Sequence, residues 1–87
     1  MPVTVEFYGL PRQRAGRTEI TTVAGTVRDA LGAAHAACPN LSGLLTPDGR
    51  LNPHYLVSLN GERFVTDLGE VLTGDARVLV MGTDAGG

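Results

Sequence analysis

The sequence contains no lysine and no tryptophan, and only one cysteine, two phenylalanines and two tyrosines among its 87 residues. The single cysteine, Cys38, excludes an internal disulfide framework. All seven basic residues are arginines, and the net charge of −2 argues against nucleic acid as a partner, because nucleic acid requires a basic surface. The hydrophobic content of 43% suffices for a core of valine, leucine and alanine.

Long apolar stretches are also missing. No run approaches the roughly 20 residues that cross a bilayer as a helix. Met1-Pro2-Val3 leads directly into an alternating pattern instead of a signal peptide. We therefore expect a single domain in the cytoplasm, without a membrane partner.

Apolar and polar residues alternate in several short segments, which is typical of strands. Val3, Val5 and Phe7 predict a strand over 3–8, which Gly9-Leu10-Pro11 ends. After a loop, a β-branched strand over 18–23 is expected to pair with it as an antiparallel hairpin. Further strands are predicted at 55–59, 63–65 and 77–81. Asn60-Gly61 predicts a tight turn between the first two of these, because both residues tolerate positive φ.

One helix is predicted between these strands. Thr26 and Asp29 have the spacing of an N-terminal capping box, and apolar residues then recur every three or four positions until Pro39 ends the helix at Cys38. One more helical turn is predicted at 41–45, packing two leucines on the core. The order β-β-α-β-β-β indicates an α+β domain over 1–81, with a mixed sheet of four to five strands on one main helix. Residues 82–87 are small and polar, and we expect a flexible tail.

The predicted domain offers few candidates for chemistry. Cys38 and His35 lie one helical turn apart, but a helix C-terminus favours a protonated histidine over a thiolate. His35 and His54 lack further metal ligands, and the carboxylates are scattered. We therefore predict no catalytic residue, no metal site and no bound cofactor in the domain.

Three arginines, Arg12, Arg14 and Arg17, cluster in the early loop. A solvated loop accounts for such a cluster. A surface for an acidic partner is the alternative reading.

Gly86-Gly87 is the remaining candidate. Six extended residues reach about 20 Å from the domain, and residues without a Cβ can enter a narrow channel of a partner enzyme. An α-carboxylate has a pKa near 3.5 and is ionised at neutral pH. The Gly87 α-carboxylate can therefore attack the α-phosphorus of ATP. The catalytic groups can then belong to partners to which Ala85 and Gly86 are presented.

Several short motifs occur in one order along the chain: the opening V-x-V-x-F strand, Arg14-Ala15-Gly16, Gly25-Thr26-Val27, Cys38-Pro39-Asn40-Leu41, Ser58-Leu59-Asn60-Gly61-Glu62, Leu72-Thr73-Gly74-Asp75-Ala76-Arg77-Val78 and the final Gly86-Gly87. In this order the chain resembles the ThiS/MoaD family of ubiquitin-like β-grasp sulfur carriers over essentially its whole length. The loop and the length resemble the MoaD-like branch.

The resemblance implies that an E1-like enzyme adenylates Gly87 with ATP and that the product becomes a thiocarboxylate, which donates sulfur. It also implies an acceptor such as the large subunit of a molybdopterin synthase, with this chain as the small subunit. The segment 82–85 lacks the prolines that MoaD-like tails often carry, and 46–54 is longer than a minimal member needs, so other sulfur-transfer pathways stay open.

Two other functions also stay open: a protein modifier that forms isopeptide bonds through Gly87, and an interaction module without tail chemistry. Leu79 and Met81 alternate with Val78 and Val80 in the last predicted strand. One of these two sets should face away from the helix, and Leu79 and Met81 are the candidates for that face and for docking the activating enzyme. The alternative is that both faces of this strand are core.

Overall fold

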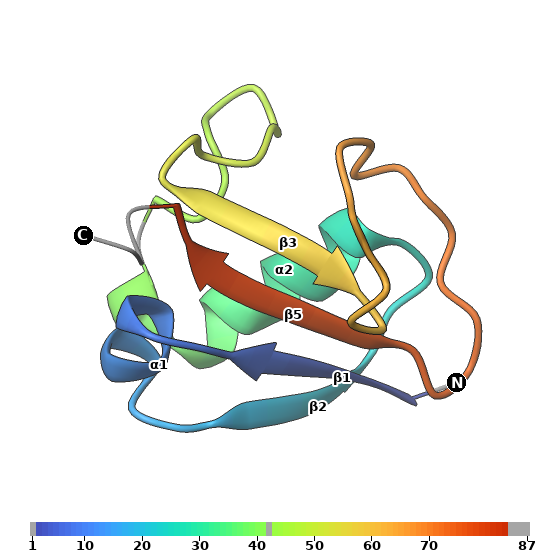
Figure 1. The fold of residues 1–87 in the computed structure, drawn as a ribbon, viewed down its shortest axis with the longest axis horizontal. Helices are drawn as coiled ribbons and strands as arrows, with labels where there is room; N and C mark the ends of the chain where they lie inside the picture. The colour runs from blue at the N-terminus through green and yellow to red at the C-terminus, as the bar shows by residue number, and fades with distance from the viewer. Residues whose placement is uncertain (1, 42, 84–87) are drawn as a thin grey trace.

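The computed structural model describes residues 2–41 and 43–83. Its elements are β1 (Pro2–Phe7), α1 (Leu10–Ala15), β2 (Glu19–Val23), α2 (Val27–Ala37), the 3₁₀ turn η1 (Pro39–Leu41), β3 (Tyr55–Leu59), β4 (Arg63–Phe64) and β5 (Arg77–Gly82). The strands form one sheet in the order β2-β1-β5-β3-β4, and α2 crosses one face of it (Figure 1). Strands β1 and β5 are parallel and the other pairs antiparallel, so the predicted mixed-sheet α+β fold is confirmed as a ubiquitin-like β-grasp. No helix in the described part of the chain is long and apolar enough to cross a membrane.

The expected hairpin of β1 and β2 is present, with Val5 opposite Ile20. Its connection, however, contains helix α1, and the prediction of a plain loop was wrong. Pro11 stands in the first turn, where its missing N–H costs no helical hydrogen bond. Gly16 ends the helix in the left-handed conformation (φ 73°), and its N–H donates to the Arg12 carbonyl at 3.0 Å. Proline just inside a segment and glycine just after it favour a helix, and this signal could have predicted α1.

Helix α2 begins and ends where the sequence predicts. The Thr26 hydroxyl accepts a hydrogen bond from the Asp29 N–H at 3.2 Å, and Cys38 forms the C-cap before Pro39. The following turn is η1, so the prediction of a turn at 41–45 placed it too late. Leu41 and Leu44 are nevertheless both buried in the core, as expected.

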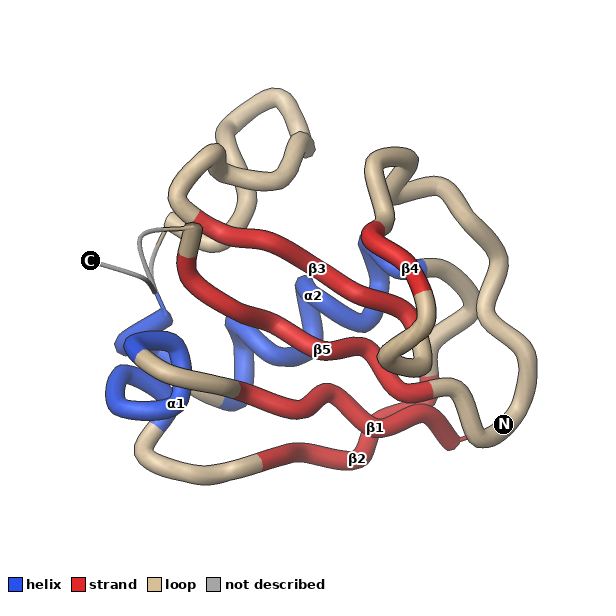
Figure 2. The backbone as a smooth tube through the Cα atoms, viewed as in Figure 1, coloured by secondary structure: helices blue, strands red, loops and turns tan. Residues whose placement is uncertain are grey.

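The tight turn between β3 and β4 is also confirmed, since Asn60 and Gly61 both have positive φ (57° and 71°). Strand β5 lies in the middle of the sheet, between β1 and β3 (Figure 2). On the α2 side, fully buried side chains from the three central strands pack against the helix, among them Val5, Val57, Val78 and Val80. Two neighbouring strands therefore hold β5 along its length, and β5 ends at Gly82.

Candidate functional site

The residues predicted to react or to be presented to partners, Ala85, Gly86 and Gly87, lie outside the described residues. The structure does describe the point from which they continue. Strand β5 runs to Gly82, one residue beyond the strand end that the sequence predicts. The Thr83 N–H then donates to the His54 carbonyl at 3.0 Å. The last described residues are thus held against the residue that precedes β3.

The two faces of β5 differ in burial. Val78 and Val80 are fully buried on the α2 side, whereas Leu79 and Met81 are half-buried on the opposite side. The expectation that Leu79 and Met81 face away from the helix is therefore confirmed. Their role in docking stays a prediction.

Leu79 and Met81 belong to a larger apolar surface on this side of the sheet. Met81 lies opposite Leu56 in the β3–β5 register, and Ser58 lies opposite both Leu79 and Phe64. Because directly opposed side chains point to the same face, Leu56, Phe64, Leu79 and Met81 form what we call the outer apolar face. Phe64 is 62% exposed. A group of exposed apolar side chains of this kind is typical of an interaction surface.

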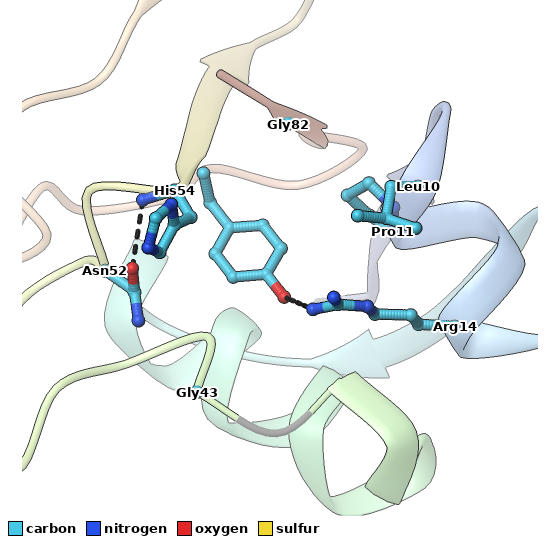
Figure 3. A pocket seen from close by; sticks show the side chains of 8 residues that line it. Leu10, Pro11, Arg14, Gly43, Asn52, His54 and Gly82 are labelled. Atoms are coloured by element: carbon cyan, nitrogen blue, oxygen red, sulfur yellow. Dashed lines mark hydrogen bonds between the residues drawn. The ribbon is translucent and has the colours of Figure 1, made fainter. Parts of the chain in front are cut away.

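A cavity of about 320 Å³ lies beside the end of β5 (Figure 3). Gly82 lines it, together with Leu10, Pro11 and Arg14 from α1 and with residues around the start of β3. The Arg14 Nη1 donates to the Tyr55 hydroxyl at 3.1 Å across this cavity. The cavity therefore joins the end of β5 to α1.

The other polar groups of this cavity come from the segment before β3. The Asn52 Oδ1 accepts a hydrogen bond from the His54 N–H at 2.9 Å, which leaves the Asn52 amide nitrogen as a donor. Gly43 contributes only backbone and has a positive φ of 81°. Among the described residues that line the cavity, none is acidic.

The arginine cluster lies on and just after α1, not in the loop that the sequence suggested. Arg12 donates from Nε to the Phe7 carbonyl at 3.0 Å, and its Cζ lies 5.4 Å from the centre of the Tyr8 ring. Arg14 and Arg17 are both exposed, and Arg14 contacts the Tyr55 hydroxyl. Two of the three arginines therefore have defined positions near the end of β5. The sequence did not reveal the contact with Tyr55, because it joins segments 41 residues apart.

Three residues were considered for catalysis or metal binding in the sequence analysis: Cys38, His35 and His54. Cys38 is buried at the end of α2, whereas His35 is exposed on the same helix. His54 borders the cavity and is also exposed. Within residues 2–41 and 43–83, no group of three or more His, Cys, Asp and Glu side chains could hold a metal ion.

No protein-family model and no curated protein sequence matches the chain. Several solved structures do. The crystal structure of SAMP1, small archaeal modifier protein 1, from Haloferax volcanii is similar with a TM-score of 0.86 and 27% identity over 100% of both chains. The solution structure of the Haloferax volcanii HVO 2177 protein has a TM-score of 0.79 and 31% identity, covering 100% of this chain and 87% of that one.

A third similar structure is the putative molybdopterin converting factor, subunit 1, from Pyrococcus furiosus. It has a TM-score of 0.75 and 20% identity, over 94% of this chain and 97% of that one. At this identity the likeness concerns the fold. Together with the fold and the identity to the two archaeal structures, the comparisons show that the chain belongs to the ThiS/MoaD family of ubiquitin-like β-grasp sulfur carriers.

Proposed function

We propose that this sulfur carrier works through a thiocarboxylate at Gly87. An E1-like enzyme adenylates the Gly87 α-carboxylate, which attacks the α-phosphorus of ATP and releases pyrophosphate. A sulfide nucleophile then attacks the acyl carbon, and AMP leaves with one carboxylate oxygen. The thiocarboxylate donates its sulfur to an acceptor enzyme, for which the large subunit of a molybdopterin synthase is the first candidate.

Membership of the sulfur-carrier family is the observation that supports this proposal most directly. The fold adds a rigid base, because β5 is paired on both sides and ends at Gly82. The chain itself binds no cofactor in this scheme, and ATP is consumed by the activating partner. The cytoplasm, where ATP is supplied, is the expected location.

Intact-mass spectrometry tests the proposal. The full-length protein is incubated with its cognate E1-like enzyme, ATP and a sulfide donor, and a matched protein without Gly87 serves as the control. We expect one oxygen to be exchanged for sulfur in the full-length protein and no change in the control. The enzyme preparation is first shown to be active on another carrier protein. If the mass of the full-length protein then stays unchanged, the proposal is contradicted.

A protein modifier is the second candidate, and one observation favours it: the 27% identical SAMP1 is named a modifier protein. Because this chain has no lysine, it cannot form lysine-linked chains with itself. Any isopeptide bond would join Gly87 to another protein. Lysine adducts on other proteins, found by peptide mass spectrometry in cells that express the tagged chain, would support this function.

A further inference from the structure

The cavity beside Gly82 combines several hydrogen-bond donors with no described carboxylate. Arg14 uses Nη1 for the Tyr55 hydroxyl, and its guanidinium carries four further N–H groups. Tyr55 accepts that bond, so its own O–H is still available to donate. The chemistry of the cavity therefore suits an anion, in particular a carboxylate that a guanidinium can bind with two parallel hydrogen bonds.

Among the other arginines of the described chain, Arg12 and Arg28 donate to the backbone carbonyls of Phe7 and Gly49, and three have acidic partners. Arg77 pairs with Glu6 at 2.8 Å, Arg50 pairs with Asp48 at 3.5 Å, and Arg63 pairs with Glu70. Arg14 has no described acidic partner either, and it is the arginine that lines the cavity beside Gly82, where it donates to a neutral hydroxyl. Arg14 thus keeps its charge uncompensated within the described residues, at the edge of a concave site.

The position of this charge suggests which molecule supplies the carboxylate. Gly82 both ends β5 and lines the cavity. An enzyme that takes up the residues after Gly82 must therefore place its own surface beside Arg14. The volume of about 320 Å³ lies at the small end of ligand sites and suits one or two side chains of a partner better than a nucleotide.

We propose that this cavity is a docking site for an Asp or Glu side chain of the activating enzyme, with Arg14 as the anchor. The inference rests on the proposed function, because it takes the activating enzyme as the partner. The outer apolar face supplies non-directional contact with the enzyme. The ion pair between Arg14 and the enzyme's carboxylate sets the orientation of the complex and the choice of partner. Arg14 is a binding residue in this scheme and takes no part in the chemistry at Gly87.

The test measures the Kd between the chain and its cognate E1-like enzyme without ATP, by isothermal titration calorimetry. We expect Arg14→Glu to raise the Kd by about tenfold or more, because the introduced carboxylate would repel the enzyme's Asp or Glu carboxylate at the cavity. Arg14→Gln should have a smaller effect of the same sign. Arg17→Glu is the matched control: Arg17 is exposed like Arg14 but lies outside the cavity lining, so the same charge change there should alter the Kd by less than about twofold.

An equal Kd for the Arg14→Glu variant, the Arg17→Glu variant and the wild type would overturn the docking site, as would a wild type that does not bind. Asp84 is the acidic residue that follows Gly82 most closely in the sequence. If Asp84→Asn abolishes the effect of Arg14→Gln in a double-mutant cycle, the carboxylate is the chain's own and the docking site is also overturned.

Adenylation is measured separately, by ATP–pyrophosphate exchange with the same proteins. Tight binding that depends on Arg14, without any exchange, contradicts the proposed chemistry at Gly87 and leaves the docking site supported. Normal exchange with no dependence of the Kd on Arg14 contradicts the docking site alone. The two failures are thus distinguishable.

Discussion

The Arg14 Nη1 lies 3.1 Å from the Tyr55 hydroxyl, so helix α1 is tied to the first residue of β3. The Tyr55 ring is buried in the core, and its hydroxyl reaches the cavity beside the end of β5. This one hydrogen bond therefore links the hairpin connection to the central part of the sheet.

Tyr55→Phe should remove this hydrogen bond and keep the buried ring. We expect the free energy of unfolding to fall by about 0.5–1.5 kcal/mol, which is the net contribution of one protein hydrogen bond. Urea denaturation followed by circular dichroism measures it. Tyr8→Phe is the control, because the Tyr8 hydroxyl is exposed and lies 3.5 Å from Glu6 Oε2. Equal losses in the two variants would show that the Arg14 contact adds nothing to stability.

The same substitution at two glycines should have opposite effects. Gly61 needs positive φ (71°) in the β3–β4 turn, so Gly61→Ala should destabilise the fold by about 1–2 kcal/mol. Gly32 lies exposed inside α2 with no heavy atom within 4 Å of an added Cβ. Gly32→Ala should therefore stabilise the fold by about 0.5–1 kcal/mol. Chemical denaturation of both variants checks the signs, and a stabilising Gly61→Ala would mean that the turn is not of this type.

Two valines on strands offer a matched test of the core. Val80 is fully buried on the central strand, whereas Val23 on the edge strand β2 is 77% exposed. Val80→Ala removes two methyl groups and leaves a cavity, so it should lower the free energy of unfolding by about 2–3 kcal/mol. Val23→Ala should change it by less than about 0.5 kcal/mol. Similar values for the two variants would contradict the position of β5 against α2.

Features that depend on neighbouring residues could be predicted from the sequence. The Thr26 cap, the stop at Pro39 and the Asn60-Gly61 turn are all decided within a few residues of chain, and the structure shows each of them. Helix α1 was missed although Pro11 stands in its first turn and Gly16 follows its last residue. It has six residues and no side-chain N-cap, so its periodicity is too short to distinguish it from a loop.

Features that depend on distant contacts could not be predicted in this way. No local pattern states that β5 pairs with β1 and β3, or that Arg14 meets Tyr55 from 41 residues away. The cavity arises from these contacts, so its lining was not predicted. The proposed reactive residue Gly87 followed from composition and family resemblance, lies outside the described residues, and stays a prediction.

The outer apolar face gives the last prediction, which concerns docking of the activating enzyme. Leu79 and Met81 are half-buried on the side of β5 that faces away from α2. Leu79→Asp or Met81→Asp places a charge where an apolar contact with the enzyme is expected. Either variant should lower kcat/KM for ATP–pyrophosphate exchange by about tenfold or more, since a charge at an apolar interface is desolvated without a partner.

Val71→Asp is the matched control, because Val71 is apolar and 72% exposed, pairs with Thr26 at the start of α2, and belongs to neither the outer apolar face nor the cavity lining. Circular dichroism and thermal unfolding confirm that each variant is folded at the assay temperature. If the Leu79→Asp and Met81→Asp variants are folded and react as fast as the Val71→Asp variant, the outer apolar face does not dock the enzyme. A loss confined to KM would place these side chains in binding, whereas an equal loss in kcat would indicate that they also position the tail for adenylation.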